Sequence, residues 1–129
     1  MKITVIVGRV LLGLMFAFAG FVKVFPVMPM EVPPGDAGAM MGLMMAHKWL
    51  LFYGVIELAG GLMLLAGRFV PLGLTLLAGL IVNIILFNAT LTPKSLPITL
   101  VIGLLELFLV YAYRASFAGI FASKPAPAV

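Results

Sequence analysis

Four polar residues stand inside long apolar stretches of the sequence, where a charged group is costly. They are Arg9, Glu57, Asn83 and Glu106. Charged side chains at membrane depth usually face the interior of a helix bundle and mark functional sites. Two carboxyl groups in one shielded interior favour at most one ionised glutamate, paired with a cation, and one protonated glutamate. Such a pocket handles protons, whereas the alternative is a structural polar clamp that fixes helix register.

The composition indicates a membrane protein of one domain. The chain has 129 residues, of which 64% are hydrophobic and 9% charged, whereas about a quarter of the residues in soluble proteins are charged. The net charge of +4 comes from basic residues scattered singly, a pattern that fits membrane orientation and not nucleic-acid binding. The chain contains no cysteine, which excludes a disulfide, a thiol relay and a thiolate metal site.

Four segments are apolar enough to cross a bilayer, which takes about 20 residues per helix. They are residues 3–25, 49–66, 69–91 and 97–114. Short turns join the last three segments, so neighbouring helices should run antiparallel. We therefore predict an all-α membrane protein, a compact antiparallel bundle of four transmembrane helices. The Met-rich connection 26–48 should contain a short amphipathic helix, and the tail 115–129 should be frayed.

The first segment also has features of a signal peptide. A basic start and an apolar run precede Ala17, Phe18 and Ala19, which resemble a cleavage site. The apolar run continues past Ala19 to Phe25, and this favours an uncleaved span over a cleaved signal.

Basic residues predict the orientation, because they concentrate on the cytoplasmic side of a membrane protein. One side carries Lys2, Arg9, Arg68, Arg114 and Lys124, and the other carries Lys23, Lys48 and Lys94, diluted by Glu31 and Asp36. Both termini should therefore face the cytoplasm of a bacterial-type inner membrane, and residues 26–48 should face outward.

Depth along the helices defines the predicted pocket. At about 1.5 Å per residue, both glutamates lie roughly 12–14 Å below the outer surface. Side chains lean toward the N-terminus of their own helix, so Asn83 and Lys23 should lean toward the glutamates. Arg9 should lean the other way, and its guanidinium group has three alternative contacts: a glutamate, Tyr113 at a similar depth, or the inner membrane surface. The predicted quinone or proton pocket comprises Arg9, Lys23, Glu57, Asn83, Glu106 and Tyr113.

The outer connection holds a cluster of methionines. Met40, Met41, Met44 and Met45 stack at i,i+4 spacing beside His47. Asp36 could cap a helix over residues 37–47 that carries them. Because thioethers select Cu(I), this cluster is one candidate copper site. The other interpretation is a helix lying on the membrane, with methionine as adaptable filler and Trp49 at the interface.

Two stretches, "RVLLGLMFAFAGFVKVF" and "IELAGGLMLLAGRFVPLGLTLL", resemble the DoxX-like family of small four-helix membrane proteins. The resemblance covers roughly residues 6–114. Arg9, Lys23, Glu57 and Arg68 match recurring polar positions of that family. The third span of relatives often ends in a histidine, where Asn88 stands nearby in this chain. This departure weakens any prediction of a histidine-assisted quinone site.

The resemblance implies a place beside quinone-linked redox enzymes. The family's namesakes are subunits associated with a terminal quinol oxidase and with a thiosulfate:quinone oxidoreductase. Others are linked to membrane redox complexes that handle sulfur or oxidative stress, and a eukaryotic relative is a receptor-assembly chaperone. Membership therefore does not fix an activity.

The residues limit the chemistry further. His47 is the one histidine and lies outside the spans, so we expect no haem, flavin or thiolate metal site in this chain. Neither glutamate has the Glu-x-x-His spacing of a di-iron bundle. Any redox event must then belong to a bound cofactor, for which a quinone is the candidate, or to a partner. No self-contained catalytic centre is visible, and whether the chain is an enzyme stays open.

Several functions follow from these observations. The first is a membrane-embedded accessory subunit of a quinone-linked redox system, because a mostly apolar crevice with a few polar groups is the usual profile of a ligand site. The alternative is a non-catalytic assembly factor or structural subunit of a larger membrane complex. A small transporter and a Cu(I)-handling protein are lesser alternatives. The expected partners are the lipid membrane and a larger redox complex or a second copy of the chain.

Overall fold

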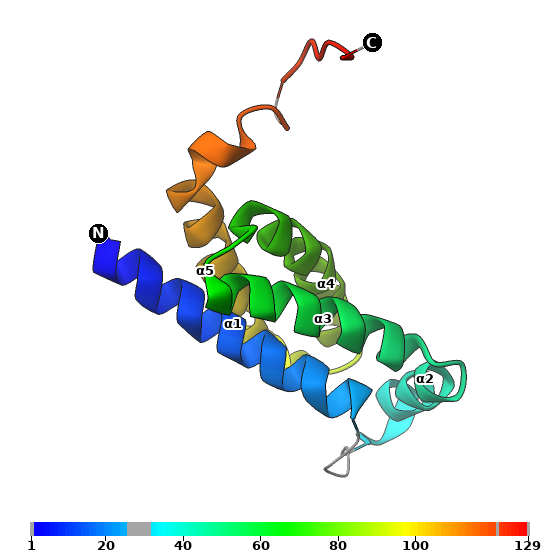
Figure 1. Cartoon of the computed structure of the whole chain (residues 1–129). Helices are drawn as coiled ribbons and strands as arrows, with labels where there is room; N and C mark the ends of the chain where they lie inside the picture. The colour runs from blue at the N-terminus through cyan, green and yellow to red at the C-terminus, as the bar shows by residue number, and fades with distance from the viewer. Residues whose placement is uncertain (1, 26–31, 121, 129) are drawn as a thin grey trace.

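Helices make up most of the computed structural model, which describes residues 2–25, 32–120 and 122–128 (Figure 1). In these residues the chain forms α1 (Lys2–Val24), α2 (Gly35–Ala46), α3 (Trp49–Ala66), α4 (Val70–Thr90) and α5 (Leu96–Ala112), with short 3-10 turns at Pro93–Ser95 and Arg114–Phe117. The predicted all-α fold, with four long apolar helices and a short helix between the first two, is confirmed. Residues 26–31 of the predicted outer connection lie outside the described residues.

The four long helices are suited to a bilayer. By length and composition α1, α3, α4 and the segment Pro93–Ala112 can each cross a membrane. Their outward faces carry large exposed apolar side chains such as Phe18, Leu62 and Val82. The chain is therefore a multi-pass membrane protein. The start of α1 and the end of α5 lie at the end of the bundle opposite to α2 (Figure 1).

A tight turn reverses the chain between α3 and α4. Gly67 adopts a left-handed conformation with φ +70°, which glycine reaches without steric cost. Its N–H donates to Leu64 O at 3.3 Å, and the N–H of Arg68 donates to Met63 O at 3.3 Å. These two hydrogen bonds satisfy carbonyls at the end of α3. Pro71 then stands in the first turn of α4. Backbone N–H groups in this turn have no partner within the helix, so the N–H that proline lacks costs no hydrogen bond.

Glycines bring α1 and α3 into close contact. A Cβ atom placed at Gly61 would lie 2.8 Å from Gly13 O, and one at Gly20 would lie 2.6 Å from Gly54 O. Real Cβ atoms essentially never come this close to another heavy atom, so only glycine fits at these positions and the two backbones touch directly. Small residues permit such an approach between membrane helices. Packing thus accounts for these four glycines.

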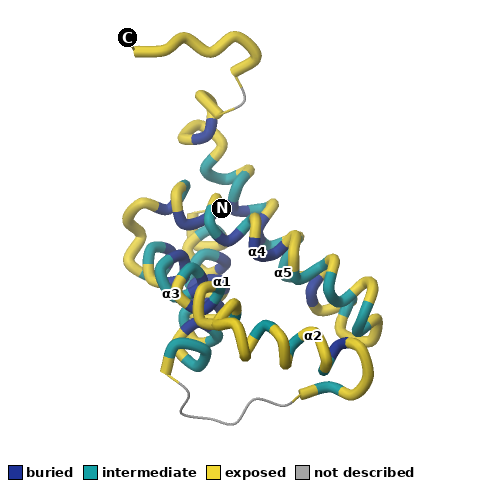
Figure 2. The backbone as a smooth tube through the Cα atoms, turned by 90° about the vertical axis from the view of Figure 1, so that its right-hand side faces the viewer, coloured by how far each residue is buried: buried dark blue, intermediate teal, exposed yellow. Residues whose placement is uncertain are grey.

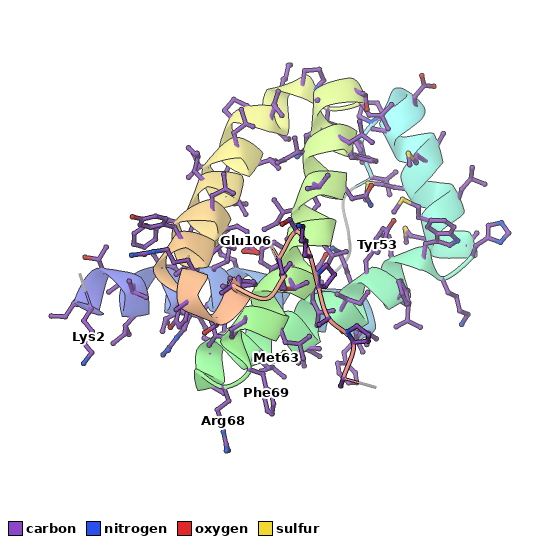
Figure 3. All side chains as sticks on the ribbon, turned by 90° about the horizontal axis from the view of Figure 1, so that it is seen from above. Lys2, Tyr53, Met63, Arg68, Phe69 and Glu106 are labelled. Atoms are coloured by element: carbon purple, nitrogen blue, oxygen red, sulfur yellow. The ribbon has the colours of Figure 1, made fainter. Side chains whose placement is uncertain are left out.

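The hydrophobic core occupies one half of the bundle. It is formed by Leu12, Phe16, Leu64, Val70, Leu74, Leu77, Leu80, Ile81, Leu109 and Phe117. Most of these residues lie toward the end that carries the α3–α4 turn and the end of α5. Toward the other end the α4–α5 pair runs at a steep angle to the α1–α3 pair (Figure 3). Helix α2 runs along this end, between the α1–α3 pair and the α4–α5 pair (Figure 2).

The start of α2 differs from the prediction. The helix begins at Gly35, and Pro34, in extended conformation, holds the N-cap position. Asp36 lies in the first turn and makes no side-chain capping hydrogen bond, so the predicted Asp36 cap is wrong. Pro34 (φ −73°, ψ 164°) is the last extended residue and the helix begins at the next one, so Asp36 lies inside the first turn and not at the N-cap. Asp36 still places a negative charge at the positive end of the helix dipole.

Candidate functional site

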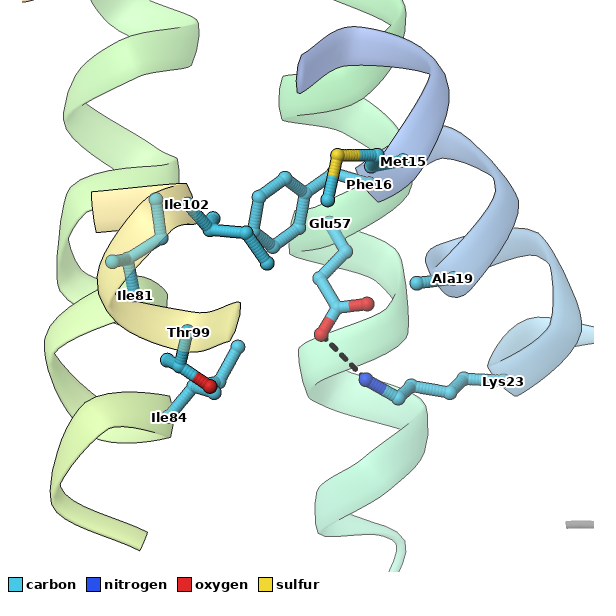
Figure 4. A pocket seen from close by; sticks show the side chains of 9 residues that line it. All are labelled: Met15, Phe16, Ala19, Lys23, Glu57, Ile81, Ile84, Thr99 and Ile102. Carbon is cyan, nitrogen blue, oxygen red and sulfur yellow. Dashed lines mark hydrogen bonds and ion pairs between the residues drawn. The ribbon is translucent and has the colours of Figure 1, made fainter. Parts of the chain in front are cut away.

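An ion pair joins α1 to α3 inside the bundle. Lys23 Nζ lies 2.6 Å from Glu57 Oε1 (Figure 4), and the side chain of Glu57 is only 3% exposed. The second carboxylate oxygen, Oε2, is buried and has no hydrogen-bond partner within the described residues. The pair therefore neutralises Glu57 and leaves one acceptor atom free.

Local packing explains why these two side chains meet. Lys23 lies in the last turn of α1, so its ammonium faces the negative end of that helix dipole. A Cβ atom at Gly54, one turn before Glu57, would lie 2.7 Å from Lys23 Cβ. Glycine at this position thus makes room for the lysine stem. The predicted lean of Lys23 toward Glu57 is observed.

A second polar contact links α3 to α4. Asn83 Nδ2 donates to Tyr53 OH at 2.9 Å. Tyr53 is one turn from Glu57, and both line the same cavity. Because the Tyr53 oxygen accepts this hydrogen bond, its own proton is free for another acceptor. Tyr53 is absent from the predicted pocket, although its i,i+4 spacing to Glu57 could have identified it.

Two cavities meet at the ion pair. The first, here called the α2 cavity, has a volume of about 270 Å³, and its walls include Lys23, Met41, Tyr53, Glu57 and Asn83. The second, the α5 cavity, has a volume of about 180 Å³ and is bounded mainly by apolar side chains such as Phe16 and Ile102 (Figure 4). Lys23 and Glu57 line both. The ion pair therefore lies where the cavities adjoin.

A hydrogen-bonded network at the α4–α5 connection borders the α5 cavity through Thr99. Asn88 Nδ2 donates to Thr99 Oγ1, and Thr92 Oγ1 donates to Asn88 Oδ1 at 2.6 Å. Thr99 Oγ1 in turn donates to Ser95 O at 3.0 Å. Thr99 lines the α5 cavity, and it too is absent from the predicted pocket.

Arg9 and Tyr113 lie together, away from these cavities. Arg9 Nη1 donates to Tyr113 OH at 3.4 Å, the second of the three predicted alternatives. The guanidinium also lies near Gly67, where a Cβ atom would come within 3.0 Å of Nη1. The prediction that both residues join a pocket with Glu57 is not met, because Arg9 leans toward the start of its helix and away from Lys23.

Glu106 is also separate from Glu57. It is buried and lines a groove between α4 and α5 with a volume of about 430 Å³, whereas Glu57 lines the α2 and α5 cavities. The predicted six-residue pocket is thus divided among three places. Lys23, Glu57 and Asn83 share one of them.

The methionines of α2 cover the α2 cavity. Met40, Met41 and Met44 contribute to its wall, and Met40, Met44 and His47 border a shallow pocket of about 370 Å³ beside it. Met45 is exposed and lines neither. In the described part of the chain, no group of three or more His, Asp or Glu residues is placed to hold a metal ion. The copper site stays a prediction.

Comparison with known proteins places these features in a family. The family model described as DoxX matches residues 4–92, a segment that includes α2, α3, α4 and nearly all of α1. No curated protein and no solved structure matches the chain. The matched segment covers more than half of the sequence and contains both the Lys23–Glu57 pair and the Tyr53–Asn83 contact. The chain therefore belongs to the DoxX family.

Proposed function

We propose that this chain is a membrane-embedded accessory subunit of a quinone-linked redox system and that it binds a quinone head group in the α2 cavity. One observation carries the proposal: polar groups from three helices, including Lys23, Glu57 and Asn83, converge on a cavity of about 270 Å³ whose other walls are mainly apolar. A small number of convergent polar groups in an apolar crevice is the common profile of small-molecule sites.

The donors and acceptors of the cavity fit a quinone. The Lys23 ammonium and the free proton of Tyr53 can each donate to a carbonyl oxygen. The unpartnered Glu57 Oε2 can accept from the hydroxyl of the reduced form. The apolar α5 cavity beyond the ion pair suits an isoprenoid tail. When bound, the quinone would supply the electron-carrying chemistry for which the side chains of this sequence offer no centre.

Glu57 has the features of a proton relay. Its Oε2 atom is buried without a hydrogen-bond partner among the described residues, while Oε1 is held by Lys23 at 2.6 Å, and the residue lines both cavities. The lysine stabilises the carboxylate when the proton leaves, and the fixed pair keeps Oε2 in position to take it back. Lys23 therefore acts on proton exchange through Glu57.

We infer an inner-membrane location with both termini in the cytoplasm. Arg68 and Arg114 lie near the end of the bundle that holds the termini, and Lys48 and Lys94 lie near the end that holds α2. The excess of basic residues over acidic ones on the first side supports this orientation. The α2 cavity then faces the outer leaflet, where α2 contacts a larger redox complex or a second copy.

Quenching of tryptophan fluorescence tests the proposal. Trp49 is the single tryptophan, and its ring lies 6.4 Å from that of Tyr53, so a quinone in the α2 cavity should quench it. We expect decylubiquinone to quench the full chain in nanodiscs saturably. Glu57→Gln should weaken the affinity at least about 10-fold, as loss of one charge-assisted hydrogen bond does.

Two further variants make the result specific. Asn83→Leu preserves the ion pair and should also lower the affinity, whereas Glu106→Gln lies outside the cavity and should leave it unchanged. Non-saturable quenching that is equal in all four proteins would overturn the proposal. Unchanged quinone-linked respiration in a Glu57→Gln strain, together with retained copurification of a larger complex, would favour the assembly factor instead.

A further inference from the structure

The Glu106 carboxyl group stands alone in a cavity that the proposed function does not use. The residue is 4% exposed, and neither Oε1 nor Oε2 has a hydrogen-bond partner among the residues that the structure describes. Burial without a partner forfeits the hydrogen bonds that the group makes in water. Buried polar groups are nearly always satisfied by protein, water or a ligand, so Glu106 calls for an explanation.

The groove around Glu106 opens toward the acyl chains of the membrane. It lies between α4 and α5, and its volume is about 430 Å³. Val82, Leu104 and Leu107 line it and are each about two-thirds exposed, at 65–67%. Figure 3 shows Glu106 in the region where these two helices face each other. A molecule dissolved in the bilayer can therefore enter the groove laterally, and Glu106 lies in the wall of the groove with both carboxyl oxygens buried.

Ile81 separates this groove from the proposed quinone site. Ile81 lines both the α5 cavity and the groove, whereas Lys23 and Glu57 line only the former of the two. Among the described residues, Lys23 pairs with Glu57, whereas the carboxyl oxygens of Glu106 have no partner. Among the described residues that line the groove, Glu106 alone is titratable, and the others are Gly, Ala, Val, Ile and Leu.

We propose that the α4–α5 groove is a second ligand site, which takes a lipophilic amine from the bilayer and holds its nitrogen on Glu106. A single acidic group in apolar walls is complementary to one basic head on an apolar tail. A neutral amine meets the protonated acid, and the O–H proton moves to nitrogen. The resulting carboxylate–ammonium pair has no net charge, so no isolated charge enters the membrane. The N–H groups then satisfy the carboxylate oxygens.

Carbodiimide labelling in nanodiscs tests this site. Dicyclohexylcarbodiimide adds to a protonated carboxyl group: the proton moves to one nitrogen, the oxygen bonds to the central carbon, and the acyl group then migrates to nitrogen as a stable adduct. Peptide mass spectrometry distinguishes Glu106 from the other acidic residues. We expect Glu106 to be labelled and dodecylamine to slow the labelling at least about 10-fold. Labelling is counted as the sum of the acylurea adduct and the dodecyl amide, because the amine can also attack the activated carboxyl group and release dicyclohexylurea. Dodecanol at the same concentration should leave the labelling unchanged.

A pair of glycine variants tests the groove itself. A Cβ atom at Gly103 meets Ile85 Cδ1 at 3.4 Å, an ordinary contact, so the backbone admits a side chain here, and Gly103→Leu should extend into the groove that Gly103 lines. Gly79 lies on α4 and faces open space outside the groove, which makes Gly79→Leu the control. Gly103→Leu should slow labelling in the absence of amine, and Gly79→Leu should not. Equal protection by amine and alcohol, an unlabelled Glu106, or equal effects of the two leucines would overturn the proposal.

Discussion

The ammonium group of Lys23 lies 2.6 Å from Glu57, between the part of the bundle that the hydrophobic core fills and the part that holds the α2 cavity. On one side, Phe16 and Leu64 belong to the hydrophobic core. On the other side, the α2 cavity extends to Tyr53 and α2. The pair thus allows a carboxylate to border a cavity at membrane depth without an unbalanced charge, and its integrity can be measured.

Removal of the lysine should destabilise the bundle more than removal of both charges. Lys23→Met leaves the Glu57 carboxylate buried without a cation, which costs on the order of 3 kcal/mol. The double variant Lys23→Met with Glu57→Gln leaves no charge and should recover most of that loss. Unfolding by SDS titration in mixed micelles measures both differences. A double variant no more stable than Lys23→Met would contradict this account.

Because the backbones of α1 and α3 touch directly, replacing a glycine at this contact by alanine should destabilise the protein. Gly61→Ala brings a Cβ atom to within 2.8 Å of Gly13 O, so the helices must separate. Overpacking of this kind costs about 1–3 kcal/mol. Gly79→Ala, which faces open space, should instead be neutral or raise stability by up to about 1 kcal/mol. The same titration compares the two variants, and similar losses in both would rule out the contact as the cause.

The sequence predicts the individual helices better than their mutual rotation. Apolar length locates the four spans, and spacing along each helix identifies the buried faces that carry Gly13, Glu57 and Glu106. Spacing cannot say how the α4–α5 pair is turned against the α1–α3 pair, and this rotation sends Glu106 into its own groove. The long side chain of Arg9 likewise has several partners within reach, and only the three-dimensional contact selects Tyr113.

Variants of two tyrosines test whether an effect on quinone binding is local to the α2 cavity. Tyr53→Phe removes the acceptor of Asn83 and a donor to the cavity, so it should weaken decylubiquinone binding about 5-fold, equivalent to roughly 1 kcal/mol. Tyr113→Phe removes a long contact of 3.4 Å to Arg9 and should leave the affinity unchanged. Trp49 quenching reports both. Equal weakening by the two variants would show that the effect is not local to the α2 cavity.

The Asn88 network should behave as one unit. Asn88→Ala removes the donor to Thr99 and the acceptor of Thr92, so we expect a loss of about 1–2 kcal/mol in the free energy of unfolding. Thr99→Val keeps the shape and should cost about 1 kcal/mol. Because the residues share a contact, the double variant should lose less than the sum. Strict additivity in SDS titration would show that the side chains act independently.

Variants of the α2 methionines distinguish between two roles, covering the α2 cavity and binding copper. Met40, Met41 and Met44 line the α2 cavity, and replacing all three by leucine keeps the apolar volume, which cores tolerate well. We expect the triple variant to bind decylubiquinone within about 2-fold of the parent affinity, whereas Met41→Asp, which adds a carboxylate to the wall, should weaken binding strongly. Competition with a Cu(I) chelator provides the opposing measurement. Cu(I) binding that the parent chain shows and the triple variant lacks would contradict a role limited to packing and would establish the sulfur atoms as ligands.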